Sequence, residues 1–341
     1  MSAGNLRFGL VGAGAIAQAY AQIFRENGCG RIVGVADVRR EAAAAVAEVL
    51  GCAHCSSAVE LADSHPLDAV IICTPPASHA GLCELFLERG INVLCEKPLT
   101  VDCATAVRML AAARRAGRIL TMAAKFRYVD DVIRARSLVL SGMLGVTGVM
   151  RVLFRAPAEM ARRWNSDRAV SGGGVLIDNG THAVDLVRYL LGPIREVFAT
   201  EAERIQGLEV EETVHMIART AEGKIATIEL SWSMPDVARD YVQLSCSRGG
   251  LSIGWKQSGY RLLSRSEWIP FGNGYSKLQA IGRQTENFAR AVAGLEQLLI
   301  TEADQLASVQ VVSAAYRSLA SGGWERVEEE GPGPQPAGGR T

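Results

Sequence analysis

An acid and a histidine in this sequence stand at a spacing that could move a proton. Asp178 and His182 are four residues apart, so on a helix they lie on the same face. A carboxylate beside an imidazole orients the ring and supports its protonated form, and the helix dipole favours an acid in the first turn. Such a pair can take a hydroxyl proton while hydride leaves the same carbon. Alternatively, Asp178 only caps a helix and His182 is a hydrogen-bonded core histidine.

The motif Cys95-Glu96-Lys97-Pro98 offers a second proton-transfer group. The apolar run 92–95 predicts a buried strand, and Lys97 follows its end. At the C-terminal edge of a parallel sheet, its ammonium group can donate to a substrate oxygen or shuttle a proton. Pro98 could adopt a cis peptide bond that directs the lysine into a cleft. The alternative is a strand-end lysine in solvent.

The N-terminal segment predicts the cofactor that would accept the hydride. An apolar strand over 6–11 runs into Gly12-Ala13-Gly14-Ala15-Ile16-Ala17, which reads G-x-G-x-x-A. The first glycine permits the sharp turn, the second lets a pyrophosphate approach the backbone, and the alanine lets the next helix pack closely. The helix start adds free N–H groups and a positive dipole end. The predicted cofactor-binding residues in this loop are Gly12, Gly14, Ala15 and Ile16.

An acid after the second strand indicates which dinucleotide is bound. The apolar run 32–36 ends at Asp37, about twenty residues after the loop. A carboxylate there can accept hydrogen bonds from the adenosine ribose hydroxyls and repels a 2′-phosphate, so we expect NAD. Arg39 and Arg40 follow and could tolerate NADP. The alternative is that Asp37 merely caps the following helix.

These groups must be positioned by two kinds of element, and the sequence changes its pattern to match. Through residues 1–125, apolar strands alternate with helices, which predicts a parallel Rossmann sheet covered on both faces. Residues 126–325 predict a second α/β domain with a large, mostly antiparallel open sheet, since strands such as 212–220 alternate apolar and polar side chains. Trp232 and Trp255 are expected on its outer face, where a partner subunit could cover them. Residues 326–341 are expected to be disordered.

Composition excludes several classes of function. Lysine plus arginine and aspartate plus glutamate number 36 each, so no basic field favours nucleic acid or a membrane surface. No membrane span or secretion signal is visible. The eight scattered cysteines suit reduced thiols in a cytoplasm. Cys52 and Cys55 lack a second ligand pair, so we predict no metal site.

Four motifs follow one another along the chain: the glycine loop, Thr74-Pro75-Pro76 with His79, Glu96-Lys97-Pro98, and Asp178-x-x-x-His182. Together, and in this order, they resemble the Gfo/Idh/MocA oxidoreductase family. The resemblance spans residues 6–319. It implies a Rossmann domain followed by an α/β domain with a large, mostly antiparallel sheet, and homodimers or homotetramers. It also implies that Lys97, Asp178 and His182 are catalytic. The cofactor pocket is implied to include Thr74, Pro75, His79, Glu96 and Lys97, and we predict that Arg39 also binds the cofactor. The family's substrates include sugars, nucleotide sugars and cyclitols.

The arginines of residues 151–168 offer a hint about the substrate. An arginine fork suits phosphate or carboxylate, and the Trp164 ring could cover a sugar. We therefore expect an anionic substrate such as a nucleotide sugar, sugar phosphate or sugar acid, against the alternative of a solvated loop. The predicted substrate-binding residues are Lys97, Arg127, Arg163, Trp164, Asp178 and His182.

The leading hypothesis is an NAD(P)-dependent dehydrogenase that interconverts a ring hydroxyl of a sugar, sugar derivative or cyclitol with a ketone. His182 would remove the hydroxyl proton, Asp178 would orient His182, and Lys97 would donate to the reacting oxygen. Three alternatives stay open: a glycosidase that oxidises and re-reduces its substrate on one bound NAD, a non-catalytic NAD-binding regulator, and a reductase of an aldehyde, imine or tetrapyrrole-like substrate.

Overall fold

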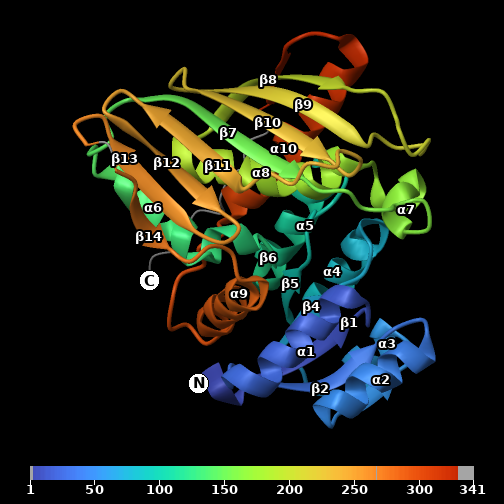
Figure 1. The fold of residues 1–341 in the computed structure, drawn as a ribbon. Helices are drawn as coiled ribbons and strands as arrows, with labels where there is room; N and C mark the ends of the chain where they lie inside the picture. Colours follow the sequence, from blue (N-terminus) through green and yellow to red (C-terminus); the bar gives the residue numbers. More distant parts are fainter. Residues whose placement is uncertain (1–2, 266, 329–341) are drawn as a thin grey trace, which may run out of the picture.

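The computed structural model describes residues 3–265 and 267–328, which form two sheets with helices between and around them (Figure 1). Most of the segment 326–341, for which disorder is predicted, lies outside the described residues. The fold class expected from the sequence, a Rossmann domain followed by a mostly antiparallel α/β domain, is confirmed.

The first sheet is parallel and has the strand order β3-β2-β1-β4-β5-β6. Its apolar strands are buried because helices cover both faces; all four residues of β4, for example, are inaccessible to solvent. The order reverses between β1 and β4, and such a reversal opens a ligand crevice beyond the C-terminal strand ends. The strands are β1 (Arg7–Val11), β2 (Arg31–Ala36), β3 (Ala53–Cys55), β4 (Ala69–Ile72), β5 (Asn92–Cys95) and β6 (Leu120–Met122). The helices are α1 (Ala15–Asn27), α2 (Arg40–Leu50), α3 (Ala58–Ser64), α4 (His79–Glu88) and α5 (Cys103–Ala116).

The second sheet has nine strands in the order β14-β13-β12-β11-β7-β10-β9-β8-β15. Only the central pair β7 and β10 runs parallel; the other described neighbours are antiparallel. Its strands are β7 (Thr147–Arg155), β8 (Ile194–Glu201), β9 (Thr213–Thr220), β10 (Ile225–Ser231), β11 (Asp240–Cys246), β12 (Gly249–Gly254), β13 (Ser258–Leu262), β14 (Ile269–Gly272) and β15 (Glu325–Arg326). The chain's later helices are α6 (Asp130–Leu140), α7 (Arg168–Ser171), α8 (Val175–Leu191), α9 (Lys277–Val292) and α10 (Glu302–Ser321).

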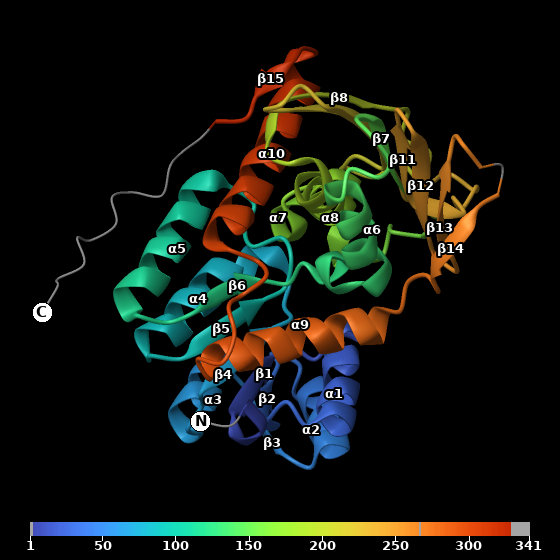
Figure 2. The same ribbon diagram turned by 90° about the vertical axis from the view of Figure 1, so that its left-hand side faces the viewer.

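The two faces of this sheet differ, as the alternating pattern predicts. In β9, Val214, Met216 and Ala218 are buried against the helices, while His215 and Ile217 are exposed. Figure 2 shows α6, α8 and α10 on one side of the sheet.

The expectation for the two tryptophans is wrong. Trp232 is buried in the core of the second sheet, and the Trp255 ring packs 4.6 Å from that of Tyr241, also in this core. Each tryptophan comes directly after its strand and continues the inward-facing positions at two-residue spacing: Trp232 follows the buried Ile228 and Leu230, and Trp255 follows the buried Leu251 and Ile253. Both side chains therefore face inward, and neither is offered to a partner subunit.

Two late helices join the two sheets into one body. Phe288 of α9 packs against Phe8 of β1, with 6.2 Å between ring centroids, and Val309 of α10 joins the core around α5. Figure 2 shows α9 beside the first sheet and α10 rising past α5 to the second. The Rossmann layer thus takes a helix from within residues 126–325. Among the described residues, no helix is both long and apolar enough to cross a bilayer.

Candidate active site

A cavity of about 700 Å³ opens at the C-terminal ends of the first strands. We call it the nucleotide cavity; its wall includes Gly12, Gly14, Ala15, Asp37, Val38, Arg39, Ser57, Thr74, Pro75 and Trp164. Gly12 has φ +90°, and a Cβ there would lie 2.8 Å from the Cys73 carbonyl carbon, so only glycine fits the turn. A Cβ on Gly14 would meet nothing within 4 Å. Since no side chain caps α1, the loop presents an open helix start to this cavity, which fits a bound pyrophosphate.

Asp37 supports the loop as well as lining the cavity. One carboxylate oxygen accepts a hydrogen bond from the Ala13 N–H at 2.7 Å, and the other accepts one from the Arg39 N–H at 2.8 Å. Burial raises the pKa of Asp37, but these bonds outweigh it, so the pKa is lowered from 3.8. The carboxylate therefore stays charged beside the cavity, where it could also accept ribose hydroxyls.

Three residues predicted for the cofactor, His79, Glu96 and Ile16, do not line the nucleotide cavity. Both ring nitrogens of His79 lie 2.8 Å from carbonyl oxygens, one of Thr74 and one of Pro98. Glu96 accepts a hydrogen bond from the Tyr20 hydroxyl at 3.0 Å. Ile16 packs on the core of the first sheet. His79 thus ties Thr74 of the cavity wall to Pro98, the residue that follows Lys97 across a cis peptide bond.

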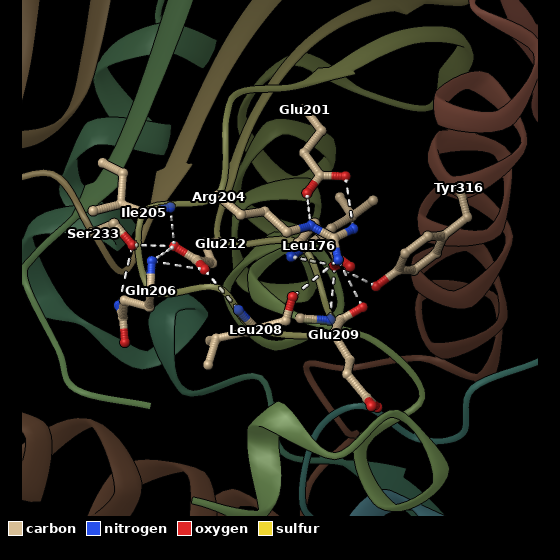
Figure 3. A network of polar contacts seen from close by, with 12 residues as sticks. Leu176, Glu201, Arg204, Ile205, Gln206, Leu208, Glu209, Glu212, Ser233 and Tyr316 are labelled. Carbon is tan, nitrogen blue, oxygen red and sulfur yellow. Dashed lines mark hydrogen bonds and ion pairs between the residues drawn. The ribbon is translucent and has the colours of Figure 1, made fainter. Parts of the chain in front are cut away.

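The helix that carries Asp178 and His182, α8, begins at Val175. Asp178 is therefore a first-turn residue and not the cap. Glu211, a buried residue of the segment before β9, holds the start of α8. Its Oε1 accepts hydrogen bonds from the Gly174 N–H at 2.8 Å and the Leu176 N–H at 3.2 Å. The Tyr316 hydroxyl of α10 donates to the same oxygen at 2.7 Å; Tyr316 and Leu176 are both drawn in Figure 3.

Glu212, the next residue, serves a different segment. Its carboxylate accepts hydrogen bonds from the N–H groups of Ile205, Gln206 and Leu208 and from the Ser233 hydroxyl (Figure 3). Gln206 in turn binds the Met160 N–H and the Ala158 carbonyl oxygen, each at 3.0 Å. Glu211 thus anchors α8, whereas Glu212 anchors the loop that supports residues 158–160.

Lys97 reaches across to α8. Its Nζ donates to the Asp178 carbonyl oxygen at 3.1 Å and forms a very short ion pair with the Asp178 carboxylate. The structure thus pairs this carboxylate with Lys97, and among the described residues no hydrogen bond joins Asp178 to His182. Because an ammonium group has three hydrogens, one remains for a ligand.

His182 is 6% exposed, and its Nε2 has no hydrogen-bond partner among the described residues. Burial, assisted by the ammonium groups of Lys97 and Lys125, holds the pKa of His182 well below 6.5. The ring is therefore neutral at physiological pH. A neutral imidazole can accept a proton, which an imidazolium cannot.

These three side chains meet in a second cavity of about 390 Å³, which we call the catalytic pocket. Its wall includes Lys97, Lys125, Phe126, Ala158, Met160, Arg163, Asn165, Asp178, His182, Trp232, Trp255 and Tyr275. Arg163 and Asn165 line this pocket, whereas Trp164 between them lines the nucleotide cavity. The turn 163–165 thus separates the two cavities. Trp164, expected at the substrate, lies on the cofactor side instead.

Arg127, expected to bind substrate, is placed elsewhere by the structure. It is buried, and its guanidinium binds Asp185 of α8 at 2.6 Å and Asp304 of α10 at 2.9 Å. Two carboxylates compensate its charge, so it joins two helices and does not line the catalytic pocket. Both partners are remote in the sequence, and no local pattern indicates them.

Comparison with known proteins identifies the family of the chain. Residues 6–124 match the model of an oxidoreductase family with an NAD-binding Rossmann fold, and residues 132–252 match the Gfo/Idh/MocA C-terminal domain. The chain belongs to the Gfo/Idh/MocA oxidoreductase family. The predicted family and the predicted nicotinamide cofactor are thereby confirmed.

Two curated relatives and one solved structure illustrate the breadth of the Gfo/Idh/MocA family. Inositol 2-dehydrogenase of Rhizobium meliloti (strain 1021) is 28% identical over 334 residues, covering 93% of this chain and 97% of the relative. D-glucoside 3-dehydrogenase of Escherichia coli (strain K12) is 31% identical over 203 residues, 56% of each chain. A levoglucosan dehydrogenase in complex with NADH and levoglucosan has a TM-score of 0.89 at 19% identity, covering 95% of this chain and 100% of its own, and shows the shared fold.

Two kinds of residue in this site are not among those that the sequence motifs predict. Lys125 lies just beyond β6, at the same sheet edge as Lys97, so the rule that ligands bind at C-terminal strand ends could have found it. The aromatic wall of Trp232, Trp255 and Tyr275 comes from segments far apart in the chain, and no spacing rule points to it.

Proposed function

We propose that this chain is an NAD-dependent dehydrogenase that oxidises a secondary ring hydroxyl of a sugar or cyclitol to a ketone, or catalyses the reverse reduction. The observation that carries the proposal is the meeting of Lys97, Asp178 and His182 in one pocket beside the nucleotide cavity. The family supports an oxidoreductase, and relatives named inositol 2-dehydrogenase and D-glucoside 3-dehydrogenase support a polyhydroxylated ring as substrate.

The residues divide the proton chemistry. Neutral His182 accepts the hydroxyl proton at an imidazole nitrogen. Lys97, held by the carbonyl oxygen and carboxylate of Asp178, donates its remaining hydrogen to the reacting oxygen and orients it. Asp178 acts chiefly by fixing and neutralising Lys97, a change from the role that the sequence indicates. NAD bound in the nucleotide cavity would supply the acceptor for the hydride that leaves the hydroxyl-bearing carbon.

The aromatic side chains of the catalytic pocket suit a sugar ring. Phe126, Trp255 and Tyr275 pack edge to face or stacked, with centroid distances between 5.1 and 6.4 Å. Their rings offer apolar surface to the C–H face of a pyranose or cyclitol, while its hydroxyls meet the polar side. The pocket thereby orients one hydroxyl-bearing carbon and excludes water from it.

The experiment is NADH formation by the purified protein with NAD and then NADP, over a panel of free sugars, inositols, sugar acids and sugar phosphates. We expect turnover with one class and a preference for NAD, because charged Asp37 repels a 2′-phosphate. His182→Ala and Lys97→Met should each lower kcat by about 10²- to 10⁴-fold, the usual worth of a positioned acid or base. NAD affinity, measured by fluorescence titration, should persist.

Turnover that survives both substitutions would refute the assigned roles. If NAD binds but no panel member is oxidised, the result favours one of two alternatives: a glycosidase that uses bound NAD, which is tested by glycoside cleavage, or a non-catalytic NAD-binding regulator. A cytoplasmic location and a homodimeric or homotetrameric state remain predictions from the sequence; size-exclusion chromatography with light scattering tests the second.

A further inference from the structure

Lys125 is a cation of the catalytic pocket that the mechanism does not use. It follows β6 at the sheet edge that carries Lys97 and lines the pocket. Its Nζ lies over the Phe126 ring, 5.7 Å from the centroid. Among the described residues it has no hydrogen bond or ion pair.

The pocket wall has an excess of positive charge. Lys97, Lys125, Arg155 and Arg163 line it, against the single carboxylate of Asp178. Lys97 is neutralised by Asp178. Arg155 has two carboxylate partners, Glu229 at 3.1 Å and Asp236 at 2.9 Å. Within the described chain, Lys125 and Arg163 are therefore the two lining cations without a counter-ion.

The Lys125 side chain is half-buried, and taking an ammonium group out of water without a counter-ion is costly. Burial lowers the pKa of Lys125 to about 8, with Lys97 and Lys277 adding to the fall while Glu96 and Asp178 oppose it. The side chain is thus still largely charged near neutral pH. Protein interiors retain such a group where a partner arrives from outside, and the space it faces belongs to the substrate.

We infer that the substrate ring carries an anionic substituent, a carboxylate or phosphate, that binds Lys125 in the catalytic pocket, with Arg163 as a second cation on the wall. This inference rests on the proposed dehydrogenase function and narrows its substrate to an acidic sugar or cyclitol derivative. Lys125 is then the residue that selects for charge, while Lys97 and His182 act on the hydroxyl group.

The test compares three probes that share one ring: D-glucose, D-glucuronate and D-glucose 6-phosphate. We expect the wild-type kcat/KM to be at least tenfold higher for one of the two anions than for glucose. Lys125→Met should reduce this ratio by about 10- to 100-fold, the usual worth of a hydrogen bond to a charged group. Which anion is preferred distinguishes a carboxylate from a phosphate.

Two variants control for charge and fold. Lys277→Met removes an exposed cation that influences the pKa of Lys125 but lies outside the pocket, and should leave the ratio unchanged. Lys125→Arg keeps the charge and should restore most of the preference.

Equal kcat/KM values for all three probes in the wild type, or equal losses on all three in Lys125→Met, would overturn the inference. If no probe is oxidised, the dehydrogenase proposal fails for these rings. Calorimetric binding of the three probes to the NAD-saturated protein then decides the role of Lys125 separately: tighter binding of an anion that Lys125→Met abolishes supports it, and equal binding rejects it.

Discussion

Two helices in this protein begin after glycine-rich segments, and their first turns are used in opposite ways. Helix α1 follows Gly12 and Gly14; no side chain caps it, and a Cβ on Gly14 would meet nothing within 4 Å. Helix α8 follows Gly173 and Gly174, where a Cβ would lie 1.9 Å from the Tyr316 hydroxyl oxygen and 2.0 Å from the Glu211 carbonyl oxygen, respectively. The first helix start is open, and the second is closed.

The difference concerns which anion meets the helix dipole. The open start of α1 is free for the phosphates of a dinucleotide. The closed start of α8 is filled by the protein's own carboxylate, Glu211. The start of α1 leaves space for a ligand. Helix α8 instead carries Asp178 and His182, whose positions must be fixed before substrate binds. Glycine-rich sequence before a helix therefore indicates a close approach to the backbone, and the tertiary structure decides what approaches.

The largest loss of stability is expected from adding a methyl group at the closed start of α8. In Gly174→Ala, the new methyl group would meet backbone of Glu211, which cannot rotate away. We expect a loss of about 2–3 kcal/mol in the free energy of unfolding, as for overpacked interiors, together with a large fall in kcat. Urea unfolding and steady-state kinetics measure both.

Gly14→Ala is the matched control at the open start. Because its methyl group meets no protein atom, the free energy of unfolding should change by less than about 0.5 kcal/mol. The methyl group would instead occupy space that the pyrophosphate needs, so the Kd for NAD should rise on the order of tenfold. Equal destabilisation by the two substitutions would contradict the distinction between open and closed starts.

A smaller effect is expected from removing the charge that closes α8. Glu211→Gln keeps an oxygen that can accept the Gly174 and Leu176 N–H groups, but loses the anion that meets the dipole. We expect a loss of about 1–2 kcal/mol in stability and a fall in kcat of about tenfold with little change in KM, since α8 carries the groups that act on the hydroxyl.

Glu212→Gln is the adjacent control with the opposite signature. Glu212 supports the loop whose Gln206 holds Ala158 and Met160, both on the pocket wall. Its substitution should raise KM more than it lowers kcat. If both variants change KM and kcat in the same proportion, Glu211 has only a general structural role and does not position α8.

A further difference is expected in the pH dependence of stability. The folded pKa of His182 lies below its usual 6.5, so beneath pH 6.5 the unfolded chain binds a proton that the folded ring does not. Stability therefore falls as pH decreases, by up to about 1.4 kcal/mol per pH unit. The pKa of Asp37 is lowered from 3.8, so its contribution is complete above that pH and is lost only below it.

Unfolding midpoints in urea between pH 7 and 4.5 check this prediction. His182→Gln should flatten the decline, while His79, whose pKa burial also lowers, keeps its share. Asp37→Asn should leave the slope in this range unchanged. An unaltered slope in His182→Gln would show that His182 of α8 is not the source of the loss of stability at low pH.

The sequence by itself determined the features that depend on neighbouring residues. Apolar strands alternating with helices predict the Rossmann sheet, the glycine loop predicts an NAD-type cofactor, and strand ends place Thr74, Asp37 and Lys97 at one edge. The alternation in β9 predicts the two unlike faces of the second sheet. Each of these follows from local periodicity or from a turn that only certain residues can make.

Only the tertiary structure decided which side chains meet. Asp178 pairs with Lys97, 81 residues away in the sequence, and not with His182 four residues away; Arg127 is held by Asp185 and Asp304; Trp164 faces the nucleotide cavity. Local spacing determines which face of a helix a side chain occupies, but the partner on that face comes from whichever distant segment packs there. Burial of charge then selects among the possible pairs, because in the interior an unpaired ion costs more than any local preference can supply.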